Sequence, residues 1–158
     1  MMKLGFKKVH PDAVLPKYAH QGDAGMDVCA VEDVVLWPFT PTLVKTGLVA
    51  EIPDGYELQV RPRSGLALKR GITVWNSPGT VDCGYKGEIG VILLWTPRCE
   101  RDIDDTVRVK ENIGVVYIYK GERIAQLVLA PVTKAEVVEI SEVGETERGT
   151  GGFGSTGV

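Results

Sequence analysis

The chain has 158 residues, a length that fits one domain able to bury a core without disulfides or a structural metal. Its 18 lysine and arginine residues against 21 aspartate and glutamate residues give a net charge of −3, which excludes a long-range positive field for capturing nucleic acid, so any anion must be held by a local cluster. Three cysteines with no CxxC pair disfavour a disulfide framework and a zinc site, and no apolar stretch is long enough to cross a bilayer, so we expect a soluble cytoplasmic protein.

Alternating polarity predicts β-strands along most of the chain. Between residues 43 and 61, every second residue points an apolar or small side chain to one face, and Pro53, Asp54 and Gly55 supply a turn, so the segment is predicted to be a hairpin. The predicted buried face consists of Val44, Thr46, Leu48, Ala50 and Ile52. Residues 89–95 are apolar on both faces, which indicates a strand buried between layers. Shorter strands are predicted at residues 107–110, 115–119, 124–130 and 136–140.

One helix is predicted, from Ser64 to Arg70, with Ser64 as its N-terminal cap and Gly71 just past its last turn. Helical periodicity is otherwise nearly absent, and 19 glycines and 9 prolines separate the short strands. We therefore expect an all-β fold, a distorted jelly roll or β-sandwich with one short helix. The glycine-rich residues 144–158 lack apolar periodicity, which predicts a flexible C-terminal arm attached to a β domain of residues 1–143.

Five clusters of small and polar residues interrupt the predicted strands, as expected where backbone approaches a ligand closely. They are residues 23–27 (DAGMD), 63–65 (RSG), 76–87 (NSPGTVDCGYKG), 121–126 (GERIAQ) and 148–157 (RGTGGFGSTG). Taken singly, each cluster has an ordinary structural explanation. Asp23 and Asp27 suit turns, Ser64 suits a helix cap, and Arg123 suits a structural ion pair.

The last cluster suits an anion, because consecutive glycine N–H groups can form a concavity to which Ser155 and Thr156 add hydroxyl donors. It is not a P-loop, since the lysine is missing and no helix follows, and the order of elements does not suit a βαβ dinucleotide-binding unit. His10 and His20 lack the spacing of a helical zinc pair, which disfavours zinc-dependent base deamination.

In this order and at these separations, the five clusters resemble the five motifs of the trimeric dUTPase family. The resemblance extends over residues 23–157. It implies a jelly roll, a homotrimer with three shared active sites, and hydrolysis of dUTP to dUMP and pyrophosphate, with Mg²⁺ carried on the triphosphate. It further implies in-line attack on the α-phosphorus by a water that an aspartate activates, and no partner that is a nucleic acid or a membrane.

Within the third cluster, Asp82 matches the family's water-activating aspartate and Tyr85 the tyrosine that packs under the deoxyribose. Asn76 falls where the family reads uracil. The backbone that shares this task belongs to Gly79, Thr80 and Val81. A rigid hairpin over residues 76–87 would supply both the hydrogen bonds that reject cytosine and the wall that rejects thymine.

Other positions match the family's contacts with the triphosphate and the metal. The phosphate contacts fall on Arg63, Ser64, Gly65 and Gln126. Asp27 matches the carboxylate that touches Mg²⁺ through water.

The arm is implied to complete the active site as a lid that orders on substrate. Arg148 is placed like the family's γ-phosphate arginine, and Phe153 like the aromatic residue that covers the uracil ring. The run that contains Gly154, Ser155 and Thr156 would add backbone and hydroxyl donors to the phosphates.

Residues 96–120 form a longer connection than the family normally carries between its third and fourth motifs, and six of the eight residues 98–105 are charged. A solvated loop that extends a hairpin explains this segment, and a partner-binding element is the alternative. Two other functions stay open. One is a dCTP deaminase of the same fold, including a bifunctional one, and the other is a nucleotide-gated regulatory trimer acting through residues 96–120.

Overall fold

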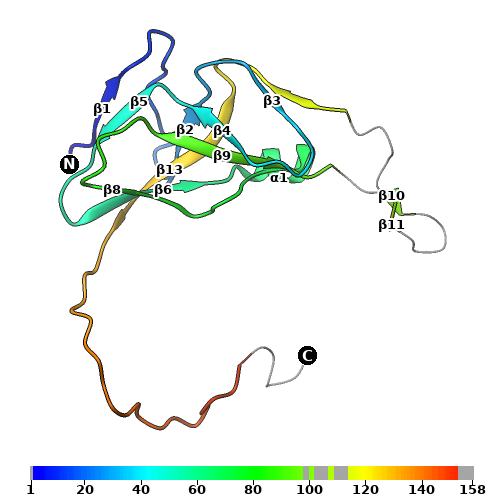
Figure 1. The fold of residues 1–158 in the computed structure, drawn as a ribbon. Helices are drawn as coiled ribbons and strands as arrows, with labels where there is room; N and C mark the ends of the chain where they lie inside the picture. Colours follow the sequence, from blue (N-terminus) through cyan, green and yellow to red (C-terminus); the bar gives the residue numbers. More distant parts are fainter. Residues whose placement is uncertain (1, 98–99, 102–106, 109–113, 153–158) are drawn as a thin grey trace.

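The computed structural model describes residues 2–97, 100–101, 107–108 and 114–152 (Figure 1). In these residues most of the regular structure is antiparallel β-sheet, and the single helix is short. The elements in chain order are β1 (Gly5–Lys8), β2 (Met26–Cys29), β3 (Val34–Leu36), β4 (Thr42–Lys45), β5 (Leu48–Glu51), β6 (Tyr56–Arg61), α1 (Ser64–Arg70), β7 (Ile72–Val74), β8 (Gly79–Asp82), β9 (Gly90–Trp95), β10 (Glu100–Arg101), β11 (Val107–Arg108), β12 (Val116–Ile118) and β13 (Arg123–Pro131). The predicted all-β class with one short helix is confirmed.

Two sheets form the body of the protein. The larger has the strand order β2-β13-β6-β8, the smaller the order β4-β9-β7, and β1-β5 and β3-β12 add two-stranded ribbons. Their inward-facing residues belong to one apolar cluster, in which Leu58 and Leu127 of the larger sheet and Val91 and Leu93 of the smaller one are fully buried. The α1 helix does not reach the length that a membrane crossing requires, and no other helix occurs in the described residues.

The predicted buried face of residues 43–61 is confirmed. All five of its residues are at most 4 % exposed, because side chains of a strand alternate between the core and solvent. The one polar member, Thr46, donates its hydroxyl proton to the carbonyl of Ile89 over 2.6 Å, which satisfies the hydroxyl inside the core. The prediction for residues 89–95 is also confirmed, since β9 is the central strand of its sheet and Leu93, Leu94 and Trp95 are all buried.

The predicted hairpin over residues 43–61 is wrong, although its turn forms. Gly55 has a φ of 77°, and the N–H of Tyr56 donates to the carbonyl of Pro53 over 3.2 Å. However, β5 pairs with β1, whereas β6 pairs with β13 and β8, so the turn carries the chain from one sheet to another. The turn chemistry predicts a reversal of direction, but it does not decide which strand edges pair.

The predicted strand at residues 136–140 is also wrong. Figure 1 shows the chain leaving β13 and running away from the sheets, with no helix or strand between residues 132 and 152. Val137 is 96 % exposed and Ile140 is 63 % exposed. Alternating apolar residues form a strand only where a neighbouring edge and an apolar face accept them, and one chain provides neither here. In the segment 96–120, β10 and β11 pair as a short ribbon, which fits an extended hairpin, while residues 98–99, 102–106 and 109–113 lie outside the described residues.

The helix spans Ser64–Arg70 as predicted, and Gly71 ends it in the left-handed conformation with a φ of 65°. The predicted cap is wrong, because the N-cap is Arg63 and no side chain makes a cap hydrogen bond. Arg63 follows a proline and keeps an extended backbone, so Ser64 is the first helical residue. Its hydroxyl is therefore available for another role.

Replacing Gly71 with alanine is expected to destabilise the fold by about 2–5 kcal/mol, because a Cβ would lie 2.2 Å from the carbonyl oxygen of Thr96 and φ is positive. Urea unfolding measures the effect. Gly55→Ala is the matched control, since Gly55 also has a positive φ but nothing lies within 4 Å of its would-be Cβ. Equal shifts for the two variants would contradict the importance of the contact with Thr96.

Candidate active site

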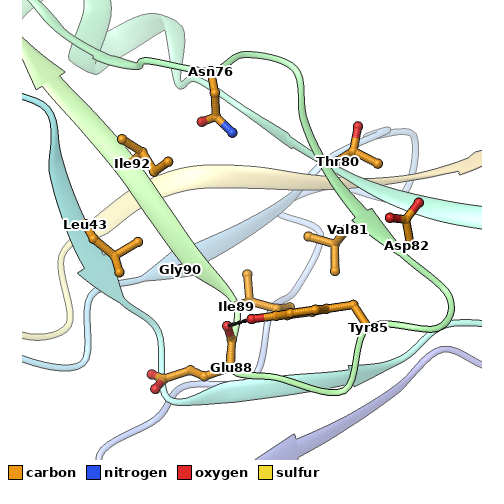
Figure 2. A pocket seen from close by; sticks show the side chains of 10 residues that line it. All are labelled: Leu43, Asn76, Thr80, Val81, Asp82, Tyr85, Glu88, Ile89, Gly90 and Ile92. Atoms are coloured by element: carbon orange, nitrogen blue, oxygen red, sulfur yellow. Dashed lines mark hydrogen bonds between the residues drawn. The ribbon is translucent and has the colours of Figure 1, made fainter.

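Residues predicted to bind the nucleoside meet in one pocket of about 270 Å³ (Figure 2). It is lined by Leu43, Asn76, Thr80, Val81, Asp82, Tyr85, Glu88, Ile89, Gly90 and Ile92. Five of these ten residues were predicted from the third cluster. The remaining five include Leu43 and Ile92, which face each other on β4 and β9. The sequence marks these two only as strand residues, so no local signal connects them with a site.

The predicted residues on strand β8 alternate between the core and solvent. Gly79 and Val81 face the core, while Thr80 and Asp82 face solvent. Gly79 has no side chain where the amide of Asn76 lies, since a Cβ there would be 3.1 Å from Asn76 Nδ2. The predicted hairpin over residues 76–87 is wrong, because β8 lies between two turns and pairs with β6 instead of with a strand of that segment.

Tyr85 is held firmly against the pocket. Its N–H donates to the carbonyl of Asp82 over 3.0 Å, which closes the turn after β8, and its hydroxyl donates to the carbonyl of Glu88 over 3.0 Å. Figure 2 shows the ring lying along one side of the pocket with its hydroxyl at Glu88. A Cβ on Gly87 would lie 2.4 Å from the Tyr85 hydroxyl, so glycine is required where the ring crosses the backbone.

Asp82 stands exposed at the end of β8, in register with Glu57 of β6. Across the described parts of the chain, no side chain donates to its carboxylate or forms an ion pair with it. A carboxylate that is open to solvent and free of partners is able to accept a hydrogen bond from a water and to take its proton.

A second group of predicted residues surrounds Asp27, whose side chain is only 10 % exposed. Arg63 Nε donates to Asp27 Oδ1 over 3.1 Å, and Arg123 Nη1 donates to Oδ2 over 2.9 Å. Gln126 lies opposite Asp27 on β13 and donates to Oδ1 over 3.5 Å. Gly25 makes room for it, because a Cβ there would be 3.1 Å from the Cβ of Gln126. The ion pair predicted for Arg123 is confirmed.

One carboxylate between two guanidinium groups leaves a local excess of positive charge on a chain with net charge −3. Such an excess suits a polyanionic ligand. No group of three or more metal-binding side chains occurs in the described residues, so they do not provide a protein cage for a metal. Both oxygens of Asp27 already accept hydrogen bonds, which fits a contact with Mg²⁺ through water better than direct ligation.

Cys29 lies two residues beyond Asp27 on the same face of β2, just outside the first of the five clusters. Burial raises the pKa of the Cys29 thiol, and the charge of Asp27 raises it further, while Arg123, Arg63 and Lys17 oppose the shift. The thiol therefore stays protonated at neutral pH.

Alkylation of Cys29 by iodoacetamide at pH 8 is expected to be slower in the folded protein than in the urea-unfolded chain, because the thiolate is the nucleophile. The rate should increase as pH rises past the ordinary cysteine pKa. The raised pKa also affects stability. Above the ordinary cysteine pKa, the unfolded chain loses the thiol proton while the folded protein keeps it, so Cys29 lowers the free energy of unfolding at alkaline pH. Peptide mass spectrometry separates Cys29 from the other cysteines, and equal folded and unfolded rates would contradict the expectation.

The arm forms a third group. Arg148 Nε donates to the carbonyl of Gly151 over 2.8 Å, and this part of the arm lies away from both sheets (Figure 1). Phe153, Gly154, Ser155 and Thr156, which were predicted to bind substrate, lie outside the described residues.

Asp82 of the first group and Gln126 of the second both lie on the outer face of the larger sheet, but they are far apart on it. Asp82 is in register with Glu57, whereas Gln126 is in register with Arg61, four residues further along β6. That is about 13 Å along the strand, and β8 and β13 are separated by a further ~10 Å across the sheet. One chain therefore brings Asp82 to Tyr85 and Asn76, and Asp27 to Arg63 and Gln126, but it does not join the two groups.

Comparison with known proteins identifies the family. The sequence profile of the dUTPase family matches residues 12–157. The deoxyuridine 5'-triphosphate nucleotidohydrolase of Picosynechococcus sp. is 51 % identical over 156 residues, which cover 99 % of both chains. The structure of the Staphylococcus bacteriophage 80alpha dUTPase with dUpNHpp superposes with a TM-score of 0.83 at 32 % identity over the whole of both chains. A phage phi11 dUTPase mutant with a structural Mg(II) ion has a TM-score of 0.74 at 28 % identity and covers 89 % of this chain and 98 % of its own. The predicted jelly-roll fold is thereby confirmed, and the chain belongs to the dUTPase family.

Proposed function

We propose that this protein hydrolyses dUTP to dUMP and pyrophosphate, and that Asp82 activates the water that attacks the α-phosphorus. The observation that carries the proposal is the pocket that Asp82 lines together with the ordered ring of Tyr85 and the amide of Asn76, with no described side chain paired to the Asp82 carboxylate. Attack in line with the leaving pyrophosphate requires a base within hydrogen-bond reach of the water, and Asp82 is the carboxylate on the solvent-facing side of β8 at this pocket.

The nucleoside would occupy the pocket with its base toward Asn76 and the backbone of Gly79, Thr80 and Val81. Hydrogen bonds to the uracil edge reject cytosine, because a mismatched base leaves buried donors and acceptors unpaired. Tyr85 would support the deoxyribose. Its hydrogen bond to Glu88 keeps the ring from moving aside, so a ribose 2′-hydroxyl would collide with it.

The triphosphate would be held by donors that are already oriented before it binds. Arg63 and Gln126 are fixed through Asp27, and the helix begins with Ser64 and Gly65, whose hydroxyl and backbone are not used in a cap. The arm would add Arg148, with Phe153 over the uracil ring and donors from Gly154, Ser155 and Thr156 on the phosphates. Mg²⁺ bound to the triphosphate would neutralise its charge, and Asp27 would touch that ion through water.

We propose a homotrimer in which each site draws on more than one chain. The separation of Asp82 from Gln126 supports this, because one triphosphate cannot contact both within a single chain. The single chain also leaves large apolar side chains in water: Leu43 at the pocket is 60 % exposed, and Val137 and Val143, which precede the arm, are more exposed still. Sedimentation equilibrium tests this, with three times the chain mass expected. Free thiols at Cys29 and Cys83 fit a reducing compartment, and we place the protein in the cytoplasm.

A nucleotide panel tests the reaction. Pyrophosphate release is measured with dUTP, dCTP, dTTP and UTP in the presence of Mg²⁺, and turnover of dUTP alone is expected. Ammonia release from dCTP would instead identify a deaminase. A protein that binds dUTP without turnover would favour the regulatory trimer acting through residues 96–120.

A further inference from the structure

Helix α1 is tied at both ends to residues 117–123, which run from β12 to the start of β13, although few apolar contacts hold it. It has seven residues, of which only Leu66 is buried, and Leu68 is 75 % exposed. A helix of two turns does not form by itself in water, so contacts with the rest of the protein must fix its direction. The direction matters, because Ser64 and Gly65 stand at its N-terminal end.

Arginine side chains provide the ties at both ends. At the start, Arg63 Nη1 donates to the carbonyl of Arg123 over 2.9 Å. At the end, Arg70 Nη1 donates to the Glu122 carboxylate, and Arg70 Nη2 donates to the carbonyl of Tyr117 over 2.8 Å. The acceptors are Tyr117 of β12, Glu122 of the turn that follows, and Arg123, the first residue of the strand that carries Gln126.

The loop itself is well fixed around Glu122. Its second carboxylate oxygen accepts from the N–H of Tyr119 over 3.2 Å, and its own N–H donates to the carbonyl of Tyr119 over 2.9 Å. The carbonyl of Glu122 accepts from Ala30 over 2.9 Å, which joins the loop to the end of β2. Arg70 therefore connects the helix to a rigid support and not to a free surface carboxylate.

We propose that Arg70 and Glu122 are positioning residues, which aim the Ser64 and Gly65 donors at the same triphosphate that Gln126 contacts. This inference rests on the proposed function. The two terminal nitrogens of the Arg70 guanidinium donate at the same time to the Glu122 carboxylate and to the carbonyl of Tyr117. A lysine, whose single ammonium group sits on a flexible side chain, does not reproduce this geometry. Without this tie, the last turn of α1 is held only through Gly71, whose carbonyl accepts from the N–H of Thr96 over 2.8 Å and from its hydroxyl over 3.1 Å, and the helix can tilt about that point.

The tie affects orientation more than stability. The side chains of Arg70 and Glu122 are 35 % and 24 % exposed, and partly solvated ion pairs contribute little to the free energy of unfolding. The helix is about 10 Å long, so a small tilt displaces its first residues appreciably. Donors that act on transition-state charge are sensitive to displacements near 1 Å, so catalysis is affected before folding is.

The test uses Arg70→Gln and Glu122→Gln in the full chain, with Lys69→Gln as the matched control in the same helical turn. Each glutamine variant is expected to lower kcat for dUTP by about 10-fold, with KM within about 3-fold, because the nucleoside pocket is formed by other residues. Lys69→Gln should match wild type, and Arg70→Lys should fall between wild type and Arg70→Gln. Thermal unfolding of all variants checks that they fold.

A double-mutant cycle between Arg70 and Ser64 distinguishes a positioning role of Arg70 from a merely structural one. In a Ser64→Ala background, Arg70→Gln is expected to lower kcat much less than it does alone, because its target donor has gone. Additive losses, or an unchanged kcat in Arg70→Gln, would overturn the inference. An inactive wild type would instead refute the proposed function. In that case faster amide exchange of the peptide over residues 63–70 in Arg70→Gln would still support the tie, and unchanged exchange would refute it.

Discussion

Replacing Asp82 with asparagine should lower kcat for dUTP by about 10²–10⁴-fold, the contribution expected of a general base. Asparagine keeps the size of the side chain and can still lie near a water, but it cannot take the proton as the water attacks. The loss should appear in kcat, because in the proposed mechanism Asp82 contacts the reacting water while Asn76 and Tyr85 hold the nucleoside. Pyrophosphate release measures it.

The Asp82→Asn variant should fold as well as wild type. Asp82 is exposed, and no described side chain pairs with it, so the substitution removes no native interaction. Glu57→Gln is the matched control, because Glu57 is the carboxylate in register with Asp82 on β6 but bonds to Gln59 over 2.8 Å. It should retain most of its activity. Turnover at the wild-type rate by Asp82→Asn would contradict the proposed mechanism.

Ending the chain after residue 147 should leave a protein that folds normally and hydrolyses dUTP at least about 10²-fold more slowly. The apolar core lies in residues 13–127, and none of the described residues 132–152 contributes to it. The unfolding free energy should therefore not change. The truncation removes Arg148 and Phe153, and in the proposed mechanism it leaves the reacting centre open to bulk water.

Two point variants of the full chain separate the contributions of Phe153 and Arg148 to this loss of activity. Phe153→Ala should weaken dUTP binding by about 1–3 kcal/mol, the range for stacking of a base on an aromatic side chain. Arg148→Ala should mainly reduce kcat, because a guanidinium near the γ-phosphate stabilises charge that moves onto the leaving pyrophosphate. Unchanged turnover after truncation would show that the arm is not a lid.

Much of the local structure was predictable from sequence. The helix Ser64–Arg70 ends where Gly71 takes a positive φ, and the buried face from Val44 to Ile52 follows from alternation alone. The pocket residues Asn76 to Tyr85 were predicted together because they lie in one motif of the family that the sequence resembles. Periodicity and backbone preference act over a few residues, so the sequence reports them directly.

Only the tertiary structure decided how these parts meet. Gly55 makes the predicted turn, yet β5 and β6 join different sheets, because pairing depends on which edges and faces are buried together. Arg70 and Glu122 are 52 positions apart, and no local pattern links them. The distance between Asp82 and Gln126 likewise follows from their register along β6. Sequence alone determined which residue types are present for dUTP chemistry. Contacts between distant segments decided which of these residues one chain can bring together, because such contacts depend on how the whole core packs.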